Sequence, residues 1–307
     1  MRLNNLQQKI LEVKKQKNAL ILVHNYQVPE IQEIADVLGD SLELCRKAQE
    51  ANDADMIVFC GVDFMAETAK VLNPDKKVVI PSVKAVCPMA GMLSMITLRE
   101  AKTKYPDAPV VLYVNTLADA KAEATVTCTS ANADKIVRQL GAKQVIFGPD
   151  KNLGFFVQKR LPDVELIYVP EDGHCRVHRF IGKGEKAMEL KKQNPGSEVW
   201  AHPECEPEFQ EKADYVLSTG GMVRRANETD AEVIIVGTEE GLIDRLQREH
   251  PEKKFLPAKK YSVCGAMKRI TLENLYIAMV DEEVEIQVPE EIAKKAAVAI
   301  ERMLEMS

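Results

Sequence analysis

The stretch ALILVHNYQ at residues 19–27 decides the fold, because two stretches of the same pattern recur along the chain: PVVLYVNTL at 109–117 and SEVWAHPEC at 197–205. Each is a short apolar run that ends in polar residues, which indicates a buried strand of a parallel sheet. Two further apolar runs follow each stretch, the last leading into a proline, at 54–61 and 78–82, 142–149 and 166–170, and 231–238 and 254–258. The chain therefore contains three units of one plan.

Strands alternate with helical segments in every unit, which predicts α/β units with parallel sheets and right-handed crossovers. We expect three pseudo-symmetric, three-layer α/β repeats around a central site, at 1–86, 87–174 and 175–264. The segment 265–307 is expected to complete the first repeat by packing on it. Its sequence predicts a helix at 271–278, a short strand at 283–288 and a closing helix at 289–306.

Composition narrows the class of protein. The chain has 307 residues, 46% hydrophobic and 29% charged, which suits a soluble globular protein. A net charge of −6 argues against a nucleic-acid partner, because binding phosphates needs a basic face. No apolar run is long enough for a secretory signal or a membrane span. Seven cysteines without such a signal favour a cytoplasmic protein whose grouped cysteines bind metal or do chemistry.

Three cysteines, Cys87, Cys175 and Cys264, keep the step of the repeat, with gaps of 88 and 89 residues. Any one alone would be taken as a buried core thiol. Three thiols on equivalent loops favour one shared centre, either zinc or an iron–sulfur cluster. A [4Fe–4S] cluster with three thiolates keeps one iron free to bind substrate as a Lewis acid. The remaining cysteines break the period. We expect Cys45 and Cys60 to pack in the core, and Cys128 and Cys205 to lie near the site without binding metal.

Three hydroxyl residues, Ser41, Ser130 and Thr219, are spaced 89 residues apart, and each opens a helical pattern. The simple interpretation is an N-cap. A helix N-terminus with a free hydroxyl is also an anion site, so three such termini would suit a small molecule with several negative groups.

Polar residues also follow the first strand of each unit, where ligands bind in parallel sheets. His24, Tyr113 and His202 occupy equivalent positions. Histidine and glutamate can transfer protons when burial tunes them, which makes His202 and Glu204 candidates. The phenols of Tyr26 and Tyr113 could stabilise an oxyanion.

The motifs at these positions resemble the quinolinate synthase family over nearly the whole chain. They are HNYQ (24–27), GDS (39–41), FCGVDFMAETAK (59–70), CPMA (87–90), YVN (113–115), CTSANA (128–133), FGPDKNLG (147–154), GHCRVH (173–178), HPEC (202–205), STGGM (218–222), GTEEG (237–241) and CGAMKRITLENL (264–275). Two features depart from the family pattern. Asp172-Gly173-His174 replaces a common tryptophan–glycine before the second cysteine, and the C-terminal C-x-x-C cysteines of some members are missing.

The resemblance implies a cytoplasmic enzyme of NAD biosynthesis that condenses iminosuccinate with dihydroxyacetone phosphate to quinolinate, phosphate and two waters. It implies one [4Fe–4S] cluster per chain, bound by Cys87, Cys175 and Cys264, with one open iron. It also implies a functional link to an L-aspartate-oxidising enzyme, and no nucleic-acid or membrane partner. The resemblance implies that Tyr26 acts in the later steps, and we expect His202 and Glu204 to act with it in proton transfer as catalytic residues. The implied substrate contacts are His24, Ser41, Tyr113, Val114, Asn115, Ser130, His202, Pro203, Glu204 and Thr219.

Two other functions stay open from the residues alone. One is an aconitase-like hydro-lyase that uses the same open iron on another small polycarboxylate. The other is a non-catalytic protein that binds metal or ligand. Formation of quinolinate distinguishes the proposed enzyme from both.

Overall fold

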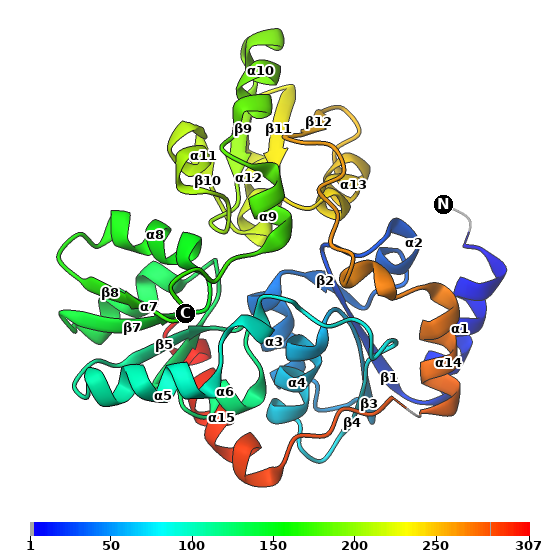
Figure 1. Cartoon of the computed structure of the whole chain (residues 1–307). Coiled ribbons are helices and arrows are strands. Elements are labelled where there is room, and N and C mark those ends of the chain that lie inside the picture. Colours follow the sequence, from blue (N-terminus) through cyan, green and yellow to red (C-terminus); the bar gives the residue numbers. More distant parts are fainter. Residues whose placement is uncertain (1–2, 283) are drawn as a thin grey trace.

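A computed structural model describes residues 3–282 and 284–307 of the chain. Three sheets form three lobes that meet near the centre of the view in Figure 1. Each sheet has four strands, all parallel, with helices packed against it, so the predicted α/β repeats are confirmed. The strand order is the same in each: β2-β1-β3-β4, β6-β5-β7-β8 and β10-β9-β11-β12.

The first repeat follows the N-terminal helix α1 (Asn5–Gln16), which begins with a capping box between Asn4 and Gln7. Its elements are β1 (Ala19–His24), α2 (Pro29–Gln32), β2 (Val37–Gly39), α3 (Ser41–Gln49), β3 (Met56–Cys60), α4 (Asp63–Leu72) and β4 (Lys77–Val79). Nearly every residue of β1 and β3 is buried, which explains the continuous apolar runs of the sequence.

The second and third repeats follow the same order of elements. The second contains η1 (Ala90–Met92), α5 (Met95–Lys104), β5 (Val110–Tyr113), α6 (Ala118–Lys121), β6 (Val126–Cys128), α7 (Ala133–Leu140), β7 (Gln144–Gly148), α8 (Lys151–Arg160) and β8 (Glu165–Tyr168). The third contains α9 (Arg176–Ile181), α10 (Glu185–Gln193), β9 (Glu198–Ala201), α11 (Pro207–Lys212), β10 (Tyr215–Val216), α12 (Thr219–Glu228), β11 (Val233–Gly237), α13 (Glu240–Glu249) and β12 (Lys254–Pro257).

The C-terminal segment contains η2 (Met267–Arg269), α14 (Leu272–Asp281) and α15 (Glu290–Glu305). Helix α14 packs on α1, in the first repeat. Helix α15 packs on α4 but also on α6 and β6, so it contacts the second repeat as well. The expected strand at 283–288 begins outside the described residues. The rest of it makes one antiparallel bridge, between Glu285 and Val79.

The hydrophobic core divides unevenly among the repeats. One large cluster joins the first two repeats and the C-terminal helices, with Ile57, Val111 and Ile300 among its buried members. The third repeat has two clusters of its own, because Trp200 and Val199, adjacent on β9, point to opposite faces of the sheet. Polar contacts therefore make up much of the joint between the third repeat and the others.

Each joint uses a buried nitrogen donor at the same repeat position, which is Gln32, Lys121 or Gln210. Gln32 and Gln210 each bond two carbonyl oxygens of their own repeat and Lys121 bonds one, and each donor also bonds one carbonyl of the preceding repeat in the ring. The cross-repeat bonds run from Gln32 to Gly241 at 2.9 Å, from Lys121 to Phe64 at 3.3 Å and from Gln210 to Asn152 at 3.0 Å. These bonds fix the loops after β1, β5 and β9, which carry site residues.

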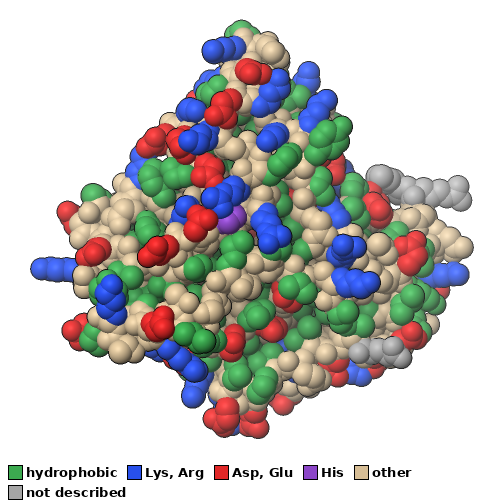
Figure 2. All heavy atoms as spheres, viewed as in Figure 1, with side chains coloured by type: hydrophobic (Ala, Val, Ile, Leu, Met, Phe, Trp, Pro, Cys, Tyr) green, Lys and Arg blue, Asp and Glu red, His purple; other side chains and the backbone are tan. Residues whose placement is uncertain are grey.

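The outer surface carries charges of both signs. Figure 2 shows Lys and Arg side chains interspersed with Asp and Glu over the face in view, as on an ordinary solvated surface. Within the described residues, no helix is both long and apolar enough to cross a bilayer.

Candidate active site

A cavity lies where the carboxyl ends of the three sheets meet. Residues of all three repeats line it: His24, Tyr26, Asp40, Ser41, Val62, Phe64, Met65, Cys87, Met89, Tyr113, Asn115, Thr129, Ser130, Cys175, His202, Glu204, Thr219, Cys264 and Met267. Of the residues expected to act in catalysis, substrate binding or metal binding, only Val114 and Pro203 are absent from this lining. Val114 is a core residue whose backbone N–H donates to the carbonyl of Cys128 at 2.8 Å.

The three in-period cysteines meet in this cavity. Cys87 follows β4, Cys175 follows β8 and Cys264 follows β12, so each comes from the equivalent loop of its repeat. Burial raises the pKa of Cys87 to about 12 and also raises the pKa values of Cys175 and Cys264. Neighbouring thiols raise the pKa values of Cys87 and Cys175 further, as expected for cysteines that line one cavity. A bound metal centre would reverse the effect, because its positive charge stabilises thiolates. Three soft ligands from three loops fit an iron–sulfur cluster.

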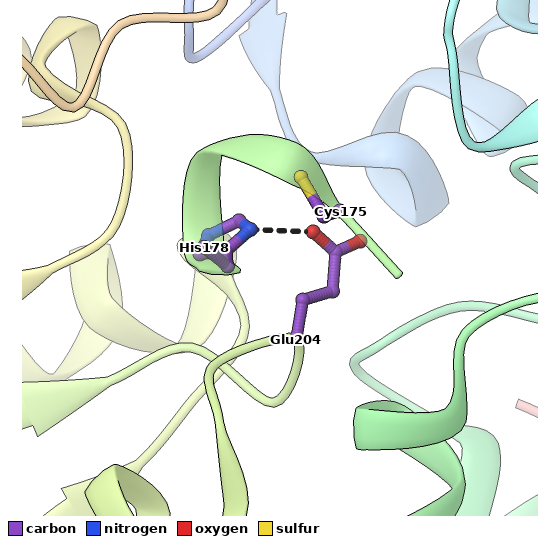
Figure 3. Close-up of side chains that lie close together, drawn as sticks. All are labelled: Cys175, His178 and Glu204. Atoms are coloured by element: carbon purple, nitrogen blue, oxygen red, sulfur yellow. Dashed lines mark ion pairs between the residues drawn. The ribbon is translucent and has the colours of Figure 1, made fainter. Parts of the chain in front are cut away.

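A second group of metal-ligand type overlaps this one. Ligand atoms of Cys175, His178 and Glu204 lie within 4.8 Å of one another. Figure 3 shows that Cys175 and His178 come from the start of α9 and that Glu204 reaches them from the loop after β9. His178 Nδ1 forms an ion pair with the Glu204 carboxylate at 2.7 Å, and its Nε2 lies 2.9 Å from Thr238 Oγ1. With both ring nitrogens engaged, His178 is better suited to proton transfer than to binding a metal.

A row of hydrogen bonds extends from His178 to Tyr26. The Tyr26 hydroxyl lies 2.7 Å from Thr238 Oγ1, which also contacts His178. If His178 donates from Nδ1 to Glu204, its Nε2 accepts from Thr238, and Thr238 then accepts from Tyr26. A continuous path for a proton therefore connects a phenol of the first repeat with a carboxylate of the third.

The ionisation of Glu204 depends on these neighbours. Burial raises its pKa, but the charge and hydrogen bond of His178, with smaller effects from His202 and Tyr113, outweigh burial and lower the pKa to about 2. The carboxylate is therefore ionised and can accept a proton. Burial, together with the Glu204 charge, raises the pKa of Tyr113 well above its usual range, so Tyr113 is a neutral phenol and a hydrogen-bond donor.

His24 and His202 have the same local geometry. Nδ1 of each ring accepts a hydrogen bond at 3.2 Å from a backbone N–H two residues on, that of Tyr26 or Glu204. Burial lowers the pKa of both histidines to about 3. Each is therefore a neutral imidazole with its proton on Nε2, which makes it a donor to an anionic oxygen. Asn115 adds a side-chain carbonyl oxygen that is buried and has no partner among the described residues.

The structure corrects the expected N-caps. Helix α3 begins at Ser41 and α12 at Thr219, so their caps are the preceding Asp40 and Ser218. The preceding side chains already accept the helix N–H groups, which leaves the Ser41 and Thr219 hydroxyls for other partners. Thr219 accepts from the Asn25 amide at 3.0 Å and can still donate its own proton.

The second repeat differs slightly. Helix α7 begins at Ala133 with Asn132 as its N-cap, so Ser130 lies in the turn before the helix.

The close approach of the first and third repeats also explains why residue 220, in α12, is a glycine. A Cβ at Gly220 would lie 2.4 Å from Asp40 Oδ2.

Several residues of the cavity, or of the proton path from Tyr26 to Glu204, were not predicted to act in the site. Asp40 and Thr129 share a repeat position with Ser218, and that spacing could have identified them. Thr238 has no counterpart in the other repeats and could be found only from the structure. His178, three residues after Cys175, could be expected from the sequence to face the cavity, but it lies outside the lining, against Glu204 and Thr238. All seven cysteines are free, and the four that break the period are buried outside the cavity lining. Cys128 nevertheless adjoins Thr129, and Cys205 adjoins Glu204.

Comparison with known proteins gives consistent matches along the chain. Residues 8–305 match the family model described as quinolinate synthetase A protein. The chain is 53% identical to a quinolinate synthase of Methanothermobacter thermautotrophicus over 305 residues, which cover 99% of both chains. It is 54% identical to one of Pyrococcus horikoshii over 303 residues, again 99% of both chains. It is 46% identical to one of Thermotoga maritima over 297 residues, 97% of this chain and 98% of the other.

Proposed function

The chain belongs to the quinolinate synthetase A family of enzymes, and we propose that it condenses iminosuccinate with dihydroxyacetone phosphate to form quinolinate, phosphate and two waters. The observation that carries the proposal is the meeting, in one cavity of a family member, of three equivalent thiols and three equivalent hydroxyls, two of which stand at helix N-termini. An L-aspartate-oxidising enzyme would supply the iminosuccinate. Seven free thiols are consistent with work in the cytoplasm, where such thiols stay reduced.

The cofactor we propose is one [4Fe–4S] cluster, held by Cys87, Cys175 and Cys264. The three thiols lie in one cavity, and soft thiolate ligands are the ordinary protein partners of such clusters. When bound, the cluster supplies one iron without a protein ligand, a Lewis acid that can polarise a hydroxyl group for loss as water. All other steps fall to side chains of this chain.

Substrate binding is assigned to the helix N-termini and their hydroxyls. The dipoles of α3 and α12 favour negative charge at Ser41 and Thr219, and Ser130 offers a third hydroxyl. Iminosuccinate brings two carboxylates and dihydroxyacetone phosphate one phosphate, so three donor sites match three anionic groups. The Nε2–H groups of His24 and His202 would donate to oxygens of the same substrates.

Proton transfer is assigned to the path between Tyr26 and Glu204. The ionised Glu204 carboxylate removes a proton from the substrate and passes it to His178 Nδ1. With its proton on Nε2, His178 releases that proton to Thr238, and the Thr238 hydroxyl passes its own proton to Tyr26. Burial and the Glu204 charge raise the pKa of Tyr26 well above its usual range, so Tyr26 stays a neutral phenol and delivers its proton to a leaving oxygen.

The direct test uses protein purified without oxygen and reconstituted with iron and sulfide. Oxaloacetate and ammonia generate iminosuccinate in the assay, and dihydroxyacetone phosphate completes it. We expect quinolinate and phosphate in equal amounts, and no quinolinate when dihydroxyacetone phosphate is omitted. Fully loaded protein that forms no quinolinate would contradict the proposal. Reversible dehydration of another polycarboxylate would favour the hydro-lyase, and binding without turnover would favour a binding protein.

A further inference from the structure

Each of the three in-period cysteines is tied to a carboxyl group at the start of a helix. The backbone N–H of the cysteine donates to that carboxyl group in every repeat. The pairs are Cys87 to Asp63 Oδ1 at 2.9 Å, Cys175 to Asp150 Oδ2 at 3.1 Å and Cys264 to Glu239 Oε1 at 2.9 Å.

A second hydrogen bond ties the same loop to the same helix start. The carbonyl two residues before each cysteine accepts from the backbone N–H of the first residue of that helix. The bonds run from Asp63 to Ala85 at 2.9 Å, from Lys151 to Gly173 at 2.9 Å and from Glu240 to Ser262 at 3.1 Å. First-turn N–H groups have no partner within their own helix, so each loop satisfies one of them. The three donors are 88 and 89 residues apart, the same steps as the cysteines.

Helix capping alone does not explain the acids. Asp150 and Glu239 also cap their helices, by accepting from Leu153 at 2.8 Å and from Gly241 at 2.7 Å. Asp63 lies one residue later in its repeat, within α4, and that helix has no side-chain cap bond. Although the acid has shifted along the chain, its bond to the cysteine N–H is retained.

We propose that Asp63, Asp150 and Glu239 are positioning residues that hold the three cysteine loops in the arrangement that binds the cluster. This inference rests on the proposed cluster ligation. Two bonds tie each loop to the start of one helix, at the cysteine N–H and at the carbonyl two residues before it, so they restrain the peptide groups beside the cysteine and the direction of its Cβ. The bonds need only an oxygen acceptor, so they form whether or not the carboxyl is ionised. Partners of this kind around metal ligands commonly change metal affinity 10–100-fold when removed.

Asp63 gives the cleanest test, because its side chain makes no cap bond. Asp63→Asn keeps an oxygen that can accept from Cys87, whereas Asp63→Ala removes it. Ser94→Ala is the matched control, since Ser94 caps α5 at Thr97 and lies outside the cavity lining. The measurement is the rate at which the anaerobically reconstituted holoenzyme loses iron to a chelator, together with the visible spectrum and the thermal midpoint of each variant.

We expect Asp63→Ala to lose iron about 10–100-fold faster than wild type. The rate of iron loss from Asp63→Asn should stay within about threefold of the wild-type rate. Ser94→Ala should lose iron at the wild-type rate. Equal rates for alanine and asparagine variants would overturn the inference, and so would a wild-type rate for the alanine variant. If Asp63→Ala does not fold, the rates of iron loss from Glu239→Gln and Glu239→Ala are compared instead. These variants test the bond that Glu239 accepts from Cys264. Wild-type protein that takes up no iron would instead contradict the proposed cofactor, so the two failures are distinguishable.

Discussion

Replacing Thr238 by valine should break the proton path while leaving the cofactor site intact. Valine has nearly the size of threonine, so the change removes the hydroxyl without opening a large void. The hydroxyl lies 2.7 Å from the Tyr26 oxygen and 2.9 Å from His178 Nε2, and Thr238 is 1% exposed. His178 Nε2 would be left buried without a hydrogen bond, and the hydroxyl of the partly buried Tyr26 would lose its partner.

The expected magnitude follows from those two lost bonds. Leaving a buried polar group unpaired costs about 1–3 kcal/mol. If the two lost hydrogen bonds together raise the activation free energy by about 3–4 kcal/mol, kcat falls about 10²–10³-fold, since 1.36 kcal/mol is a factor of ten in rate. That range agrees with the usual contribution of general acid–base catalysis, about 10²–10⁴-fold. KM should change little, because the substrate is assigned to other residues.

The assay is the steady-state rate of quinolinate formation, with iron and sulfide content measured on the same samples. Thr238→Ser is the matched control, because serine keeps the hydroxyl, and it should retain kcat within about tenfold of wild type. A valine variant with wild-type kcat would refute the path. Equal losses in valine and serine variants, or a loss explained by missing iron, would refute it as well.

Three further predictions concern stability and loop geometry. Burial lowers the pKa of Lys121 from 10.5 to about 8, so in urea unfolding the stability of wild type relative to Lys121→Gln should rise by about 3 kcal/mol between pH 8 and 10.5. Gly173→Ala should reduce iron content severalfold, because its Cβ would lie 1.8 Å from the Pro149 carbonyl oxygen and displace the Cys175 loop. Gln210→Leu should cost about 3 kcal/mol of stability, since three carbonyls lose their donor.

The sign for Lys121 follows from its folded-state pKa being depressed. Between the folded and unfolded pKa values the unfolded chain binds more protons, so raising the pH favours the folded state. Equal pH slopes in wild type and Lys121→Gln would contradict this reasoning. A fully loaded Gly173→Ala protein would contradict the loop argument. Gly91→Ala is the control, because its Cβ would meet open space and its φ, like that of Gly173, is not positive. An unchanged urea midpoint for Gln210→Leu would show that the joint contributes little.

The strands that could be predicted are those with long apolar runs. β1, β5 and β9 are buried on both faces, so their sequences are apolar except at His24, which ends β1, and Glu198, which begins β9. The edge strands β2, β6 and β10 were missed because they are only three, three and two residues long, too short for a pattern. Pairing with the neighbouring first strand, which is a tertiary effect, defines them.

The repeat also determined which site residues could be found. A chemical type that recurs three times, such as the cysteines, stands out from the sequence. His178 and Thr238 occur once each, and their importance arises only because folding brings them beside Glu204 and Tyr26. The N-caps of α3 and α12 lie one residue before the predicted Ser41 and Thr219, because the side chains of Asp40 and Ser218 accept the helix N–H groups.

Ligation of one cluster by three equivalent cysteines is tested most directly by counting iron and sulfide in the anaerobically reconstituted protein. Wild type should hold about four of each per chain and show a brown chromophore. Changing Cys87, Cys175 or Cys264 to alanine should abolish the chromophore and quinolinate formation, whereas Cys45→Ala, a buried thiol outside the cavity, should keep both. A colourless wild-type protein, or a full cluster in any of the three ligand variants, would contradict three-cysteine ligation.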